Sequence, residues 1–265
     1  MSPARAPAME VHPPFAAFAA AYDSGRPQVL WTTLVADLDT PVSAMLKLAG
    51  NRPNSFLLES VEGGATRGRY SLIGLDPDLV FRANGKNATI NRKWPADPDA
   101  FEPCPEDTLT ELRKLVASCR LDVPPQLPPA LALLVGNMGY ETIGLVENLP
   151  VPETDAIGVP DMTFVRPTLL LVFDRLKDEL FLVAPVWTAD SAAEEKARER
   201  IEAAAARLAQ PLPHAVRARI PAEIAVPQPV LAPGAYGSMV KRAKDYIAAG
   251  DIFQVVLAQR FTAPF

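Results

Sequence analysis

The segment Leu57-Leu58-Glu59-Ser60 places an acidic and a hydroxyl side chain at the end of an otherwise apolar strand pattern. Side chains of a strand alternate between its two faces, so Glu59 and Ser60 point to opposite sides. Glu59 could neutralise the ammonium group of a small zwitterion, and Arg69, beyond a glycine-containing turn, could bind a carboxylate. By spacing alone, the simpler alternative is that Glu59 and Arg69 pair with each other at the end of a sheet.

A second candidate is Gln254, which stands among apolar neighbours in the segment 252–261. An amide in such a strand can donate and accept hydrogen bonds without carrying a charge. For a lone glutamine the common role is structural, because a buried amide satisfies backbone groups. The residue therefore needs further support before any chemistry is assigned to it.

The elements that must position these side chains follow from hydrophobic periodicity and turn signals. Alternating or apolar runs predict strands at 28–36, 55–61, 70–73, 79–82, 88–91, 131–136, 162–173, 179–186 and 252–261, with a hairpin turn at Asn84-Gly85. Amphipathic spacing predicts helices at 15–22, 106–119 and 191–209, one from Thr40-Pro41 to Gly50, and one that ends at Gly250. Ser191 opens a capping box at the start of the helix at 191–209. Strands and helices without regular alternation indicate an α+β fold of layered antiparallel β-sheets with flanking helices.

Composition narrows the classes of function. The net charge of -5 argues against a nucleic-acid partner, which would require clustered Lys and Arg. Apolar runs have strand length and the N-terminus makes a poor signal sequence, so we expect no membrane span and a cytoplasmic protein.

Cys104 and Cys119 lack metal-site spacing, and we expect Cys119 to be a buried free thiol. Aspartates beside prolines, at 76, 78, 97 and 99, are interpreted as turn residues and not as a metal cluster.

Two long segments carry a family resemblance. The stretch Gly250-Asp251-Ile252-Phe253-Gln254-Val255-Val256-Leu257-Ala258-Gln259-Arg260-Phe261 closely resembles the entry into the chorismate-binding half of anthranilate synthase component I. Upstream, the stretches 56–64 and 67–74, FLLESVEGG and RGRYSLIG, are similar to the regulatory N-terminal segment of the same family. The resemblance covers nearly all of this chain but only the N-terminal part of a full component I.

The resemblance implies a role for each part of the chain. It implies an N-terminal regulatory domain at 1–209, a proline-rich linker at 210–233, and the beginning of an incomplete chorismate-binding catalytic domain at 234–265. Leu58, Glu59, Ser60 and Arg69 stand at the feedback site for L-tryptophan in that family. Gln254 stands where water-adding relatives carry a basic lysine, and an amide there fits an aminating enzyme, since ammonia needs less activation than water.

The family reaction is that of a lyase, which converts chorismate and ammonia to anthranilate and pyruvate in the first step of L-tryptophan biosynthesis. The ammonia comes from a glutamine amidotransferase subunit, component II. The family uses Mg2+, and its ligands and most catalytic residues lie downstream of this chain, so we expect no metal site here and no activity from the chain alone. Two alternatives remain: aminodeoxychorismate synthase component I, and a non-catalytic module that binds an amino acid or docks a partner.

Overall fold

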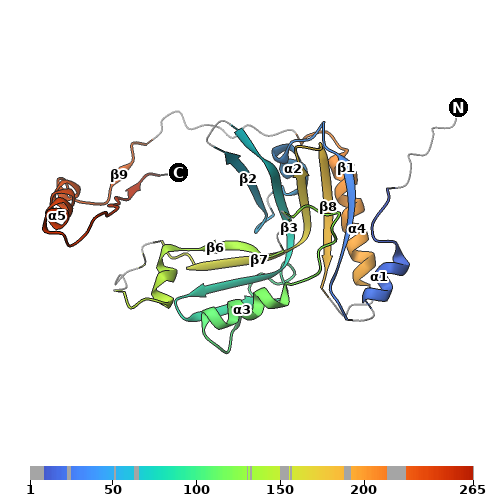
Figure 1. Ribbon diagram of the computed structural model, residues 1–265, viewed down its shortest axis with the longest axis horizontal. Coiled ribbons are helices and arrows are strands. Elements are labelled where there is room, and N and C mark those ends of the chain that lie inside the picture. The colour runs from blue at the N-terminus through green and yellow to red at the C-terminus, as the bar shows by residue number, and fades with distance from the viewer. Residues whose placement is uncertain are drawn as a thin grey trace. The chain divides into compact units, whose positions relative to one another are not determined.

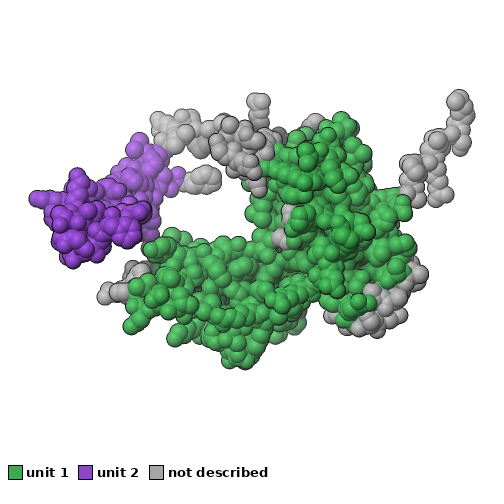
Figure 2. All heavy atoms as spheres, viewed as in Figure 1, with its two compact units in different colours: residues 1–213 green, residues 214–265 purple. Residues whose placement is uncertain are grey.

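The computed structural model describes residues 9–22, 25–50, 52–62, 66–129, 131, 133–149, 155, 157–187, 192–213 and 225–264. The chain divides into two compact units, Met1–Pro213 and His214–Phe265, which are coloured separately in Figure 2. The functional division expected from the sequence, with a linker at 210–233, stays a prediction.

The described elements of the first unit are helices and antiparallel strands in mixed order (Figure 1). The helices are α1 (Phe15–Tyr22), α2 (Pro41–Leu48), α3 (Thr108–Ser118), the 3-10 helix η1 (Tyr140–Leu145) and α4 (Ala193–Leu208). The strands are β1 (Gln28–Val35), β2 (Phe56–Glu62), β3 (Thr66–Asn84), β4 (Asn87–Asn91), β5 (Glu102–Pro103), β6 (Val135–Met138), β7 (Met162–Asp174) and β8 (Glu179–Val186).

These strands form one 8-stranded sheet with the order β1-β8-β7-β3-β4-β5, in which β2 also pairs with β3 and β6 with β7. Every one of these pairings is antiparallel. The expected α+β class with antiparallel strands and flanking helices is therefore confirmed. Because the described strands of this unit belong to a single curled sheet, the expected layering of several sheets stays a prediction.

The sheet bends where two prolines face each other in its two longest strands. Pro77 of β3 lies opposite Pro167 of β7, and the register shifts between Pro77 and Leu79. Proline has no N–H to donate to a ladder, so a bulge with altered twist is the expected outcome. Asp76, on the N-terminal side of the bulge, has a positive φ of 48°. Both strands continue past this point, so they run through both halves of the sheet (Figure 1).

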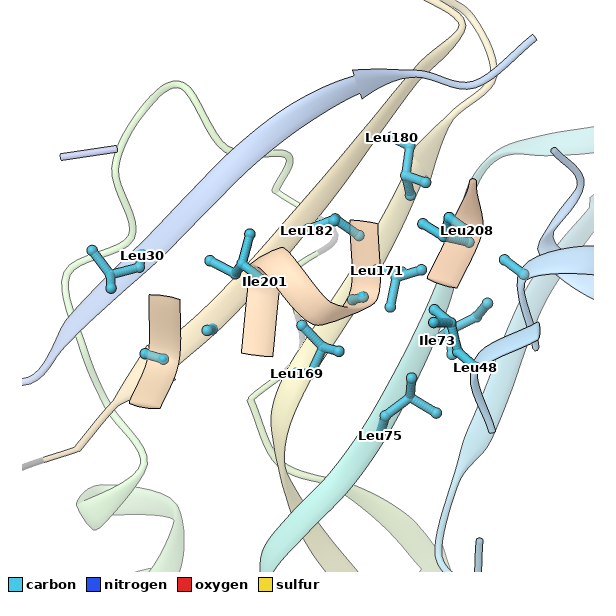
Figure 3. Packing of buried hydrophobic residues seen from close by; sticks show 14 of the residues in the cluster. Leu30, Leu48, Ile73, Leu75, Leu169, Leu171, Leu180, Leu182, Ile201 and Leu208 are labelled. Atoms are coloured by element: carbon cyan, nitrogen blue, oxygen red, sulfur yellow. The ribbon is translucent and has the colours of Figure 1, made fainter. Parts of the chain in front are cut away.

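Three clusters of buried apolar side chains hold the first unit together. The largest packs α1, α2 and α4 against one face of β1, β8, β7 and β3, as Figure 3 shows for Ile201 and Leu208 of α4 among leucines of the strands. A second cluster joins α3 to the end of the sheet formed by β3, β4 and β7. A third lies on the opposite face of the sheet, where the irregular segment around Leu127 covers β1, β3, β7 and β8.

Several local predictions are confirmed. Thr40 caps α2, since its hydroxyl accepts a hydrogen bond from the Ser43 N–H and Pro41 is the first helical residue. Gly85, with φ of 52°, supplies the turn between β3 and β4. Cys119 is buried and free. The predicted capping residue Ser191 lies outside the described residues.

Other local predictions are wrong for identifiable reasons. Residues 70–73 and 79–82 belong to the single strand β3, because the chain continues through the bulge instead of turning. Asp76 and Asp78 therefore lie in a strand, where they pair with Arg52 and Arg166. The expected buried strand at 131–136 is displaced to β6, which is half-buried to exposed. The apolar run before β6 packs on the sheet as an irregular segment instead.

The second unit contains β9 (Gln228–Pro229), α5 (Ala235–Ala249) and β10 (Phe261–Thr262). The predicted helix ending at Gly250 is confirmed, and Gly250 takes the left-handed conformation with φ of 83°. The predicted strand at 252–261 is wrong, because this segment is irregular up to the short β10, which pairs only with β9. None of the residues described in 225–264 is buried.

The packing of α4 on the sheet predicts a large effect at Ile201, whose side chain is 0% exposed. Ile201→Ala removes buried methyl groups and leaves a cavity, so the free energy of unfolding of the chain should fall by about 2–5 kcal/mol. The measurement is chemical denaturation followed by far-UV circular dichroism. Glu202→Ala, at the exposed neighbouring position of the same helix, is the matched control and should change this free energy by no more than about 0.5 kcal/mol. Equal effects of the two substitutions would contradict the packing described.

Candidate functional site

The residues Leu58, Glu59 and Ser60 lie together in β2, at the end of the sheet where β2 pairs with β3. Glu59 lies opposite Ser71 of β3, and Ser71 in turn lies opposite Phe173 of β7. Residues directly opposite in antiparallel strands share a face, so Glu59 and Ser71 point to the same side of the sheet. A register shift between Glu59 and Val61 ends the regular ladder just beyond this point.

Leu58 and Ser60 are the neighbours of Glu59 in β2. Leu58 lies opposite Leu72, on the other face of the sheet, and is 47% exposed. The backbone of Ser60 belongs to β2, while its side chain lies outside the described part of the structure. Leu58 and Glu59, two of the four residues predicted to form one site, therefore come from one strand but point to opposite faces of the sheet.

The carboxylate of Glu59 has a partner that was not predicted. Nη2 of Arg175, in the turn between β7 and β8, lies 2.8 Å from Oε1 of Glu59 and donates a second hydrogen bond of 3.0 Å to Oγ of Ser71. The side chains of Glu59 and Arg175 are 35% and 24% exposed. Nε of Arg175 is buried without a hydrogen-bond partner in the structure. The pair is thus partly accessible and incompletely satisfied.

Arg69 makes a different ion pair at the same end of the sheet. Its Nε and Nη2 donate to the two carboxylate oxygens of Asp174 at 2.8 and 2.6 Å, and its guanidinium lies 4.8 Å from the centre of the Tyr70 ring. The side chain of Asp174 is only 3% exposed. The hydrogen bonds from Arg69 lower the pKa of Asp174 below its ordinary value, although burial acts in the opposite direction; the N–H of Leu176 adds to the lowering.

The simpler alternative of a direct pair between Glu59 and Arg69 is therefore wrong. Each of these residues pairs with a neighbour in the turn that follows β7, Glu59 with Arg175 and Arg69 with Asp174. The reason lies in the register of β3 and β7, which sets Tyr70 opposite Asp174 and so brings the turn beside β2 and β3. No local feature of the sequence indicates that the charges of this turn would meet Glu59 and Arg69.

Gln254 lies in the second unit, in the irregular segment after α5. It is exposed, and its neighbour Phe253 is 94% exposed. The segment folds back along α5, where Oη of Tyr236 lies 3.4 Å from the carbonyl oxygen of Leu257, and toward β9, where the N–H of Val230 donates to the carbonyl of Arg260. The catalytic role of Gln254 stays a prediction.

Among the described residues, no group of three or more His, Cys, Asp or Glu side chains is arranged to hold a metal ion. The part of the chain that the structure describes thus offers no ligand set that fits the magnesium ion implied by the resemblance, and we derive no step through it. Within the same residues, no helix combines the length and apolar character required to span a bilayer.

Comparisons with known proteins identify the family. A protein of Cereibacter sphaeroides named anthranilate synthase component 1 is 41% identical over 255 residues, which are 95% of this chain and 51% of that protein. A protein of the same name from Thermus thermophilus is 38% identical over 238 residues, which are 88% of this chain and 47% of that protein. The chain thus spans about half the length of these relatives.

The fold has a solved counterpart. The crystal structure of anthranilate synthase component I from Streptococcus pneumoniae matches with a TM-score of 0.56 and 24% sequence identity, over 87% of this chain and 48% of that chain. The expected resemblance to anthranilate synthase component I is confirmed by these comparisons. A family model described as chorismate binding enzyme matches residues 53–265, which is most of the sequence. The chain therefore belongs to the chorismate binding enzyme family.

Proposed function

We propose that this chain is the N-terminal half of an anthranilate synthase component I. The whole protein would act as a lyase, converting chorismate and ammonia to anthranilate and pyruvate in the first step of L-tryptophan biosynthesis. The observation that carries the proposal is the 41% identity to a protein of that name, which extends over 95% of this chain. Membership of the chorismate binding enzyme family supports chorismate as the substrate.

The remaining roles follow from this proposal. Ammonia would come from a glutamine amidotransferase subunit in the cytoplasm, and the Mg2+ ligands and most catalytic groups would come from the part of the relatives that this chain does not span. The exposed apolar side chains of the second unit, Phe253 and Val256 foremost, support a need for further protein to cover them. We assign residues 1–209 to regulation and residues from 234 onward to the beginning of the catalytic domain.

For regulation, we propose that Leu58, Glu59, Ser60 and Arg69 belong to a feedback site for L-tryptophan. Glu59 supports this assignment because its carboxylate is partly exposed at the end of β2 and can accept a hydrogen bond from an ammonium group. Arg69 supports it because its side chain is a basic group at the same end of the sheet and is 42% exposed although it pairs with Asp174. An amino acid bound there would inhibit the whole enzyme if it favoured an inactive conformation.

The first test is turnover. The 265-residue chain by itself should produce no anthranilate from chorismate, even with Mg2+ and ammonium in excess, because groups needed for catalysis are missing. Anthranilate fluorescence measures the product. The matched control is a chain extended to the length of its relatives, which should be active under the same conditions. Product formed above background by the 265-residue chain would show that catalysis does not need the missing half.

The second test concerns Glu59 and Ser60 in the extended chain. Glu59→Ala removes a charge-assisted hydrogen bond to the ligand, which is worth about 1.5–3 kcal/mol, so the L-tryptophan concentration for half inhibition should rise about tenfold or more. Ser60→Ala should raise it in the same direction. Glu106→Ala is the control, because Glu106 is a half-exposed carboxylate in another ion pair of the same unit. Unchanged inhibition in both Glu59→Ala and Ser60→Ala would place the site elsewhere.

The third test concerns Gln254 in the extended chain. Gln254→Lys should lower the rate of anthranilate formation, because a cation beside the substrate repels ammonium and can activate water in its place. Product analysis would then detect some hydroxylated product. Gln259→Lys, five residues further on, introduces the same charge as a control. A Gln254→Lys variant with a normal melting curve and the wild-type rate would remove Gln254 from the active site.

A further inference from the structure

The turn between β3 and β4 contains the one Asn-Gly pair in the sequence, Asn84-Gly85. An asparagine that precedes glycine loses its side-chain amide readily, because glycine has no Cβ to shield its backbone nitrogen from the asparagine side chain. Both residues are exposed, so water can reach them. The sequence and the exposure of this turn therefore mark Asn84 as a site where deamidation can occur.

Deamidation of this pair requires a reaction between two neighbouring groups. The backbone nitrogen of Gly85 loses its proton and forms a bond to Cγ of Asn84, while the bond from Cγ to Nδ2 breaks and the amide leaves, with that proton, as ammonia. Water then opens the resulting cyclic imide at either carbonyl carbon and leaves aspartate or isoaspartate at position 84. The first step depends on a Gly85 nitrogen that is free to lose its proton and to turn toward Cγ.

The structure holds both reacting groups with a single residue, Asp161, which directly precedes β7. Ala83 lies opposite Met162 in the ladder of β3 and β7, and Asp161 meets Asn84 and Gly85 just beyond that pair. Oδ2 of Asp161 accepts a hydrogen bond of 2.7 Å from the N–H of Gly85. The N–H of Asp161 donates in turn to Oδ1 of Asn84 at 3.3 Å. The nucleophile and the side chain that it would attack are therefore both occupied.

The charge of Asp161 also opposes the first step. Removing the proton from Gly85 while the carboxylate faces it would place two negative charges side by side, which is unfavourable. Thr108 of α3 fixes the turn from another side, because its hydroxyl donates to the carbonyl of Gly85 at 2.7 Å and its N–H to the carbonyl of Lys86 at 3.3 Å. Thr108 is 0% exposed, so this anchor belongs to the interior of the folded unit.

We propose that Asn84-Gly85 is a latent deamidation site that Asp161 protects by holding the N–H of Gly85 and the side chain of Asn84. This protection is a property of the folded first unit and does not depend on the activity of the whole enzyme. Where deamidation does occur, it places a second carboxylate beside that of Asp161. The like charges repel, so the modification loosens this end of β3 and β7.

The test incubates the folded 265-residue chain at mildly alkaline pH and follows, by mass spectrometry, the conversion of amide to acid in the peptide that contains Asn84. The folded wild-type chain should deamidate at Asn84 about tenfold or more slowly than the same chain in denaturant. Asp161→Ala removes the acceptor and should raise the rate in the folded chain by a similar factor. Asp161→Asn keeps an oxygen acceptor without the charge, so its rate should lie between those of the wild type and Asp161→Ala.

The matched control is Asp155→Ala, because Asp155 accepts the N–H groups of Ile157 and Gly158 in a different turn, and its removal should leave the rate at Asn84 unchanged. Circular dichroism establishes that each variant is folded. If Asp161→Ala is not, a raised rate in Asp161→Asn supports the proposal and the wild-type rate overturns it. Equal rates in the folded and the denatured wild-type chain overturn the protection. A folded Asp161→Ala chain that deamidates at the wild-type rate or more slowly overturns the role of Asp161.

Discussion

The pairing of β3 with β7 is the constraint on which the other features of the first unit depend. The two strands are far apart in the sequence, yet they pair from Tyr70 opposite Asp174 to Ala83 opposite Met162. Closing such a long loop costs entropy, which the buried apolar side chains of both strands offset. A one-residue slip of β7 would turn Leu171 and Phe173 to the opposite face and move Arg175 away from Glu59. Core packing and the geometry of the candidate site are therefore fixed by the same register.

At the end of this ladder, two ion pairs lie side by side and differ in burial. Asp174 is almost fully buried, so its pairing with Arg69 is required once the sheet has formed. The pair of Glu59 and Arg175 is partly exposed, and such a pair contributes little to stability. The structure thus separates a buried pair that maintains the end of the sheet from a partly exposed pair that contributes little to stability.

Elements whose sequence signals are local could be predicted from the sequence alone. The apolar periodicity of 106–119 and the Thr40-Pro41 start predicted α3 and α2 because each helix buries one stripe and satisfies its own first turn. Pro77 was misleading, because proline in a strand usually marks a turn and here marks a bulge opposite a second proline. The segment 252–261 has strand-like residues, but Phe261 at its end is the one residue of the segment that pairs with another strand. A strand without a partner cannot satisfy its backbone hydrogen bonds.

The candidate site was predictable only in part, because its contacts join residues that are far apart in the sequence. Glu59 and Arg69 stand out by type and by resemblance, whereas Arg175 is one of several charges in a polar turn. Its importance depends on which residue of β7 faces Ser71, and that is a long-range property of the sheet. Local sequence patterns indicate candidate residues, whereas the register of the paired strands determines which of their side chains come into contact.

Binding at the sheet end and inhibition of catalysis are separate properties in the proposed function. A ligand shifts an equilibrium only by the difference between its affinities for the two states. In the proposed function, contacts of Glu59 with an amino acid would set how tightly the amino acid binds, while the coupling to catalysis would depend on how the whole enzyme differs between its active and inactive states. In that proposal, a substitution at Glu59 would act on the first quantity, the affinity for the amino acid. Substitutions that abolish inhibition but preserve binding must act on the second, so direct binding measurements on the first unit and inhibition measurements on the whole enzyme report different parts of the mechanism.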